Sequence, residues 1–236
     1  MTPPDGGIAY DDGEIFVVVT GLRRPSSNAK TGDLVQTWIL VRAVAPVEAQ
    51  RTGEDALVCG SCPQRPALGG SCYVTTAHAP LSVWRAYHAG RYPVLKPEHL
   101  QRARARGAAL RIGSYGDPAA VPAKMWAALS AHFRRTVGYT HQWQSAPELR
   151  SLCMASVDSP EEREEARAQG WRTFRMRRQG EPLLAHEVVC PASAEAGFSR
   201  TCGTCGACDG ARSEDRRASV AIVEHGARVR RLKVIA

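Results

Sequence analysis

The chain has 236 residues, 44% of them hydrophobic, which fits one α/β domain with a full core. No apolar run reaches the roughly 18 residues of a membrane span, and residues 1–14 show no signal-peptide pattern. These features exclude a membrane-embedded protein and predict a cytoplasmic location. In that compartment, clustered cysteines favour metal binding over disulfides.

The formal net charge is +8, and most of the basic residues are arginines. Such a balance fits a polyanionic partner, DNA or RNA, although solvated surface charge in an Arg-rich protein would give the same composition. Three basic runs carry much of the charge, at Arg102, Arg104 and Arg106, at Arg175, Arg177 and Arg178, and at Arg228, Arg230 and Arg231.

In chain order, the sequence predicts a disordered segment over residues 1–14, buried strands over 14–22 and 34–41, and a short helix over 80–90. From residue 109 onward, strands and helices alternate. We expect strands within 109–118, 137–143, 153–159, 171–176 and 186–190, helical segments over 121–136, 146–152 and 159–170, and one or two strands within 218–226 and 230–236.

The strongest helix signal is "SPEEREEARAQG" over residues 159–170. Ser159 suits the N-cap and Pro160 the first helical position, while Glu162 completes a capping box. Alternating strands and helices with short connections predict parallel strands with right-handed crossovers. We therefore expect one α/β domain over 15–236, a complete or partial βα barrel with cysteine-rich insertions at 59–74 and 190–210; an open doubly wound sheet is the alternative.

Polar residues follow several predicted strands, at the strand ends where parallel βα folds bind ligands. Asp117, His141 and Asp158 are the candidate catalytic residues, although each also suits a turn, cap or structural role. We expect the three side chains to lie on one rim of the fold.

Four cysteines near the C-terminus predict one metal centre: Cys190 at a strand end, and Cys202, Cys205 and Cys208 in "TCGTCGACDG". Four thiolates complete a structural zinc site. The close C-x2-C-x2-C spacing equally suits a four-cysteine iron–sulfur cluster, and the intervening glycines let the loop fold tightly.

A second group consists of Cys59, Cys62 and Cys72. Three thiolates leave a coordination position open unless His78 or His88 fills it, and an open position separates catalytic from structural metal sites. A zinc knot or partly buried thiols are the alternatives. Cys153 lies within a predicted strand and is expected to be a small core residue.

Several segments together resemble a group of phage- and plasmid-borne proteins that look like reduced relatives of radical S-adenosylmethionine (radical SAM) enzymes. They are "NAKTG" (28–32), "CGSCPQR" with "CYV", "RIGSYGDP" followed by "GYTHQW", and "CPAS" with "TCGTCGAC". This resemblance covers roughly residues 26–210. The chain has C-x2-C-x9-C where radical SAM enzymes carry C-x3-C-x2-C.

The radical SAM resemblance implies a TIM-barrel-like fold with one or two 4Fe–4S clusters, and a nucleic acid or nucleotide as the substrate to be modified. Cys59, Cys62 and Cys72 would then hold the cluster that binds S-adenosylmethionine. The cofactor-binding positions implied are Asn28, Lys30, Gly113, Ser114, Tyr115 and Gly116, with Asp117 beside them.

A weaker resemblance is to tRNA-guanine transglycosylases and the phage enzymes that insert 7-deazaguanines into DNA. It implies a transferase in which Asp117 recognises the base, Asp158 is the nucleophile, and His225 joins Cys202, Cys205 and Cys208 around zinc. A third hypothesis is a zinc-stapled nucleic-acid-binding module without catalysis.

Overall fold

The computed structural model describes residues 5–26, 28 and 30–226. Within this part of the chain, strands form two five-stranded sheets ordered β1-β2-β3-β4-β5 and β6-β7-β8-β10-β9. The strands of the first sheet are β1 Gly6–Asp11, β2 Ile15–Thr20, β3 Leu34–Val41, β4 Ala109–Tyr115 and β5 Thr136–Val137. Those of the second are β6 Tyr139–Thr140, β7 Met154–Val157, β8 Thr173–Arg177, β9 Glu187–Val189 and β10 Ser219–Val223.

The described helices are short and connect or flank the strands. The α-helices are α1 Pro46–Thr52, α2 Ala56–Cys59, α3 Ala79–His88, α4 Pro97–Ala105, α5 Ala123–Ser130, α6 Pro160–Ala168 and α7 Cys202–Cys205. Three 3-10 turns complete the set: η1 Pro66–Leu68, η2 Pro118–Ala120 and η3 Pro147–Leu149. None of these helices is long and apolar enough to cross a membrane.

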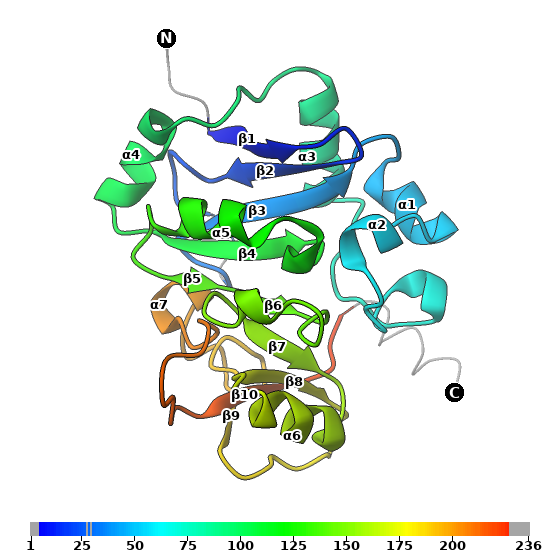
Figure 1. The fold of residues 1–236 in the computed structure, drawn as a ribbon, viewed down its shortest axis with the longest axis vertical. Coiled ribbons are helices and arrows are strands. Elements are labelled where there is room, and N and C mark those ends of the chain that lie inside the picture. The colour runs from blue at the N-terminus through cyan, green and yellow to red at the C-terminus, as the bar shows by residue number, and fades with distance from the viewer. Residues whose placement is uncertain (1–4, 27, 29, 227–236) are drawn as a thin grey trace.

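The two sheets form one continuous run of strands (Figure 1), because β5 and β6 are separated only by Gly138. The carbonyl of Gly138 accepts a hydrogen bond from the Met154 amide at 3.0 Å, which carries the ladder from one sheet to the next. From β3 to β9, every strand pair among the described residues is parallel. Helices α5 and α6 lie on the same face of this run.

The predicted α/β class with parallel strands is confirmed, with an antiparallel addition at one edge. β1 pairs antiparallel with β2, and β2 with β3. The prediction of disorder over residues 1–14 is therefore wrong for β1: its backbone completes the sheet edge despite the glycines at positions 6 and 7. A Cβ on Gly6 would lie 2.6 Å from the Val19 carbonyl, so this edge strand requires a residue without a side chain there.

Most predicted elements from residue 109 onward are present but shorter than expected. The helix predicted over 121–136 is confined to α5, and the segment 137–143 supplies only the last residue of β5 and the two-residue β6. In α6, Ser159 Oγ accepts the Glu162 amide at 3.1 Å, as predicted, while the Glu162 carboxylate accepts the Asp158 amide at 2.7 Å instead of the N-cap amide. The possible strand at 230–236 lies outside the described residues.

Candidate functional site

One cavity of about 480 Å³ lies between the N-terminal cysteine loop and the ends of the parallel strands. Such a volume suits a small-molecule ligand. The lining brings together residues far apart in the sequence, from both cysteine groups and from several strand ends: Cys59, Cys62, Cys72, Cys190, Cys202, Cys208, Asp117, His141 and Asp158. The expectation that Asp117, His141 and Asp158 lie on one rim is thus confirmed.

The N-terminal cysteine loop is held by a buried arginine. Arg65 donates to Asp55 Oδ1 from Nε and Nη2, at 2.9 and 2.8 Å, and to the carbonyls of Gly53 and Gly60 at 2.6 and 3.2 Å. Both side chains are at most one-tenth exposed. Because a buried ion pair with further hydrogen bonds fixes geometry strongly, the backbone before Cys62 has a defined path over the cavity.

His141 connects the cysteine loop to the strand rim. Its Nδ1 lies 3.2 Å from Cys62 Sγ, and its Nε2 lies 3.4 Å from Asp158 Oδ2. Burial alone would lower the pKa of His141, but the contacts with Asp158 and Cys62 raise it to about 10. The ring is therefore protonated at neutral pH and faces a sulfur on one side and a carboxylate on the other.

Asp117 is buried and fully engaged by hydrogen bonds. Its Oδ1 accepts the Thr140 hydroxyl at 2.6 Å and the Ala119 amide at 2.9 Å, and its Oδ2 accepts the His141 amide at 2.8 Å. Burial raises the pKa of Asp117, and these hydrogen bonds oppose the rise. This arrangement caps η2 and positions His141, so the carboxylate acts on the site through its neighbours.

The "GSYG" segment ends β4 and turns the chain toward η2, and its backbone requires glycine at two positions. Gly113 and Gly116 have φ values of 66° and 82°. A Cβ on Gly113 would lie 2.7 Å from the Gly116 carbonyl, and a Cβ on Gly116 would lie 2.6 Å from Ile39. The turn leaves Ser114 Oγ and Tyr115 Oη buried at the cavity wall without a hydrogen-bond partner among the described residues.

The C-terminal cysteines surround a separate small void of about 30 Å³ that adjoins the large cavity. Cys190, Cys202, Cys205 and Cys208 all line it and all are reduced. Thr201 caps α7, with its Oγ1 accepting the Thr204 amide at 3.3 Å, and the Cys208 carbonyl accepts the Gly138 amide at 3.1 Å. The loop is therefore attached to the point where the two sheets meet.

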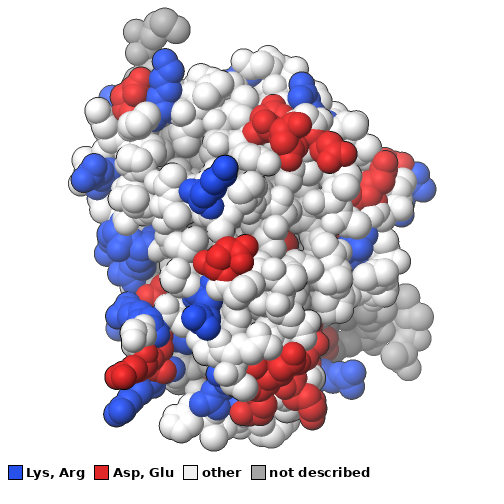
Figure 2. Space-filling model, viewed as in Figure 1, with Lys and Arg blue, Asp and Glu red and all other residues white. Residues whose placement is uncertain are grey.

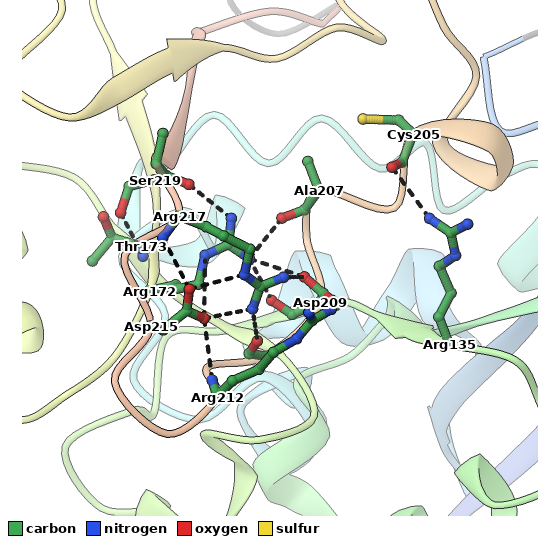
Figure 3. A network of polar contacts seen from close by, with 12 residues as sticks. Arg135, Arg172, Thr173, Cys205, Ala207, Asp209, Arg212, Asp215, Arg217 and Ser219 are labelled. Carbon is green, nitrogen blue, oxygen red and sulfur yellow. Dashed lines mark hydrogen bonds and ion pairs between the residues drawn. The ribbon is translucent and has the colours of Figure 1, made fainter.

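Arginines that are not part of the C-terminal cysteine loop form hydrogen bonds with it (Figure 3). Arg172 donates to the Ala207 carbonyl and to Asp209 Oδ1, both at 2.9 Å. Arg217 joins Asp209 to Asp215, with distances of 2.6 Å to Asp209 Oδ1 and 2.8 Å to Asp215 Oδ1. Arg135 donates to the Cys205 carbonyl at 3.2 Å. These contacts hold the cysteine loop without using its thiols.

The two cysteine groups were compared with the geometry that a bound metal ion requires. Among the described residues, no group of three or more His, Cys, Asp or Glu side chains is arranged to hold one metal ion. A tetrahedral zinc with bonds of about 2.3 Å needs four sulfurs drawn tightly together. The four C-terminal cysteines line a void of about 30 Å³.

The remaining predicted residues occupy different environments. His78 lines the cavity, whereas His88 lies outside it with Nε2 2.9 Å from the Arg42 carbonyl. His225 lines the large cavity and not the void among the C-terminal cysteines. The fourth sulfur or nitrogen donor at that void is therefore Cys190 and not His225. Cys153 is fully buried, which confirms its assignment to the core.

Asn28 and Lys30, the cofactor-binding positions that the radical SAM resemblance implies, also line the large cavity. Asn28 Oδ1 accepts the Lys30 amide at 2.9 Å, which shapes the turn before β3. Sequence reasoning missed the buried Arg111 and the tyrosines that it contacts, Tyr73 and Tyr139. The sequence signal that could have identified Arg111 is its position as a charged residue inside the apolar run "ALRIG".

No protein-family model, curated protein or solved structure matches this chain.

Asp215, which pairs with Arg217 beside the C-terminal cysteine loop, makes the stability of the fold depend on pH. Hydrogen bonds from Arg217 lower the pKa of Asp215 below that of an unfolded aspartate. The stabilisation is therefore complete above about pH 4 and is lost as pH falls toward the folded-state pKa. We expect Asp215→Asn to unfold at lower urea than the wild type at pH 7, with a gap that narrows by pH 3; a constant gap would contradict the assignment.

Proposed function

We propose that this protein is a radical-SAM-like iron–sulfur enzyme that modifies a nucleic acid or nucleotide in the cytoplasm. Cys59, Cys62 and Cys72 hold the reactive 4Fe–4S cluster. The second centre, held by Cys190, Cys202, Cys205 and Cys208, supports it.

One observation carries this proposal: both cysteine groups, far apart in the sequence, line the same cavity together with the polar strand ends. A structural zinc knot needs no such shared cavity, whereas two redox centres and a substrate must approach one another. The C-terminal group is complete with four thiols, and the N-terminal group has three. An incomplete set leaves one iron with an exchangeable position.

The strand arrangement also supports a partial barrel as the finer description of the fold. The parallel run from β3 to β9 brings strand-end residues of β4, β6 and β7 to the same cavity. Residues at the carboxyl ends of successive parallel strands form the ligand site in such folds. The antiparallel β1 and β2 lie beyond β3 at one edge of the run.

The segment 113–117 suits a small polar cofactor. S-adenosylmethionine, when bound to an iron–sulfur cluster, supplies one-electron radical chemistry. The unpartnered hydroxyls of Ser114 and Tyr115 are available to its polar groups, and the Gly113 and Gly116 turn lines the same cavity. His141 holds a proton beside Cys62, at the side of the cavity where the N-terminal cysteines lie.

Anaerobically purified protein is expected to contain iron and sulfide and, with dithionite and S-adenosylmethionine, to release 5′-deoxyadenosine. Cys62→Ala should abolish this release and leave the C-terminal metal in place, because the two groups bind separately. Cys205→Ala should give insoluble or metal-depleted protein, since metal and fold stabilise each other.

Cys153→Ala is the matched control for both variants, because Cys153 is buried in the core away from the cavity lining. It should keep both centres and the release of 5′-deoxyadenosine. Wild-type protein that holds only zinc and releases no 5′-deoxyadenosine would sink the proposed activity.

The Cys62–His141–Asp158 contacts favour a second candidate function, covalent catalysis by the Cys62 thiolate. A nucleophile within reach of a histidine that a carboxylate orients is the general arrangement of such sites. The Cys62–His141 distance of 3.2 Å meets this description, and Asp158 lies at ion-pair distance, 3.4 Å, from the other side of the ring. Here the protonated His141 would stabilise the thiolate that attacks the substrate.

Alkylation distinguishes the two candidates. If Cys62 is a nucleophile, metal-free protein should be modified by iodoacetamide fastest at Cys62, and His141→Gln should slow that modification by at least tenfold. Asp158→Asn should slow it less, because the carboxylate acts only through the ring. Equal rates at Cys59 and Cys62, measured by mass spectrometry, would exclude thiolate activation.

Fewer of the predicted basic residues are free to contact a nucleic acid than the sequence suggested. Arg175 and Arg177 are buried and paired with Glu187 and Glu195, so only Arg178 of this run is exposed. Arg106 pairs with Asp33, and the run at 228–231 lies outside the described residues. Figure 2 shows basic side chains along the edge where α4 and α7 lie.

Arg102 and Arg104 are exposed on α4. Of the predicted basic runs, these are the described residues that remain free at that edge. Replacing both with Glu should weaken binding to single- or double-stranded DNA or RNA and flatten its salt dependence. Arg51→Glu, at an exposed site on α1, is the control that should change binding less. Unchanged affinity and salt slope in the double variant would remove this edge from the interface.

A further inference from the structure

Two basic side chains line the large cavity beside the C-terminal cysteines, Lys30 and Arg111. Neither forms an ion pair with a carboxylate among the residues that the structure describes. Burial lowers the pKa of Lys30, Cys190 and Cys202 oppose this, and the nearby Arg111 lowers it further. Burial would lower the pKa of Arg111, but Tyr139, Tyr73, Cys202 and Cys208 raise it. The acidic residues of the cavity are engaged at its other cysteine group.

Arg111 extends from β4 and is only 8% exposed. Its Nη2 donates to Tyr73 Oη at 2.8 Å and to Tyr139 Oη at 3.0 Å, and its guanidinium carbon lies 5.6 Å from the centre of the Tyr139 ring. Its Nε is buried with no hydrogen-bond partner among the described residues. Arg111 also lines the void among the four cysteines. The cation therefore lies on the wall between the two spaces.

Lys30 is placed beside the same cysteines by the backbone. The Lys30 carbonyl accepts the Cys202 amide at 2.9 Å, and the Thr31 carbonyl accepts the Gly203 amide at 2.9 Å. Lys30 Nζ lies 3.1 Å from His225 Nε2. This geometry fixes the turn that carries Lys30 to the first turn of α7.

Arg111 is buried and Lys30 is half-buried, and neither has a carboxylate counter-ion among the described residues; this is unfavourable, because a cation removed from water loses hydration without gaining an opposite charge. Four thiolates around a divalent zinc, or around a 4Fe–4S core of charge 2+, have a net charge of 2−. One lysine and one arginine supply a charge of 2+. The loaded centre and the two cations therefore neutralise one another.

We infer that Lys30 and Arg111 are the counter-charges of the C-terminal metal centre, which they stabilise in its thiolate form and, where it holds iron, set at a higher reduction potential. The inference rests on the proposed metal centre at these four cysteines. It does not depend on which metal they hold, since zinc and the iron–sulfur core give the same net charge.

The test uses full-length Cys62→Ala protein, so that signals from the reactive cluster are removed. Lys30→Met and Arg111→Gln are introduced into it separately. Each should weaken metal retention against a chelator on the order of 10–100-fold, as loss of a supporting contact does at other metal sites. For iron-loaded protein, each should shift the midpoint potential, followed by electron paramagnetic resonance, to a more negative value.

Two variants control for effects other than charge. Arg111→Lys keeps the charge but not the planar fork that reaches both phenols, and it should stay near the parent potential. Arg134→Gln removes an exposed cation that donates to the Gly203 carbonyl at 2.9 Å on the same loop, where water screens its charge. It should leave the potential and metal retention nearly unchanged.

Unchanged retention and potential in folded Lys30→Met and Arg111→Gln proteins would overturn the inference, and would assign the two cations to an anion in the large cavity instead. Protein that holds only zinc would end the radical proposal, but weaker zinc retention in the same variants would still support the counter-charge role. The two failures are therefore separable by metal analysis.

Discussion

The structure depends on one short backbone connection, at Gly138. There the first sheet ends in β5 and the second begins in β6, and Gly138 forms hydrogen bonds in two directions. Its carbonyl accepts the Met154 amide from β7, and its amide donates to the Cys208 carbonyl. A Cβ at this position would lie 2.6 Å from the Ile112 side chain, so only glycine permits the approach to β4. The same residue thus joins the sheets and attaches the cysteine loop to them.

The strand and helix pattern from residue 109 onward could be predicted because each element carries a local signal. The Ser159 cap and the apolar run of β7 are examples, and both are present. The edge strand β1 could not be predicted in this way, because its glycines lack strand propensity and its pairing with β2 is what orders it. Helix α4, rich in charged residues, was missed for a related reason: few apolar positions mark its buried side.

The cysteines and strand-end residues of the candidate site were predictable, whereas Arg111 with its tyrosines, and the roles of the individual residues, were not. Cysteine spacing and strand ends identified the residues that gather around the cavity. The same reasoning could not show that Asp117 is occupied by three hydrogen bonds, or that His141 lies between Cys62 and Asp158. Those facts depend on loops that meet only in three dimensions, since Cys62 and His141 are 79 positions apart.

The cavity has opposite electrostatic character at its two cysteine groups. Beside Cys59 and Cys62 lie Asp117, Asp158 and one protonated histidine, whereas beside Cys190 and Cys202 lie Lys30 and Arg111. Three thiolates on a 2+ core would add one negative charge at the first group, and four would add two at the second. With the proposed clusters bound, the second group would be neutral overall, while the first would retain negative charge. A ligand with a cationic group would consequently bind at the N-terminal cysteines, on the side where the Ser114 and Tyr115 hydroxyls have no partner among the described residues.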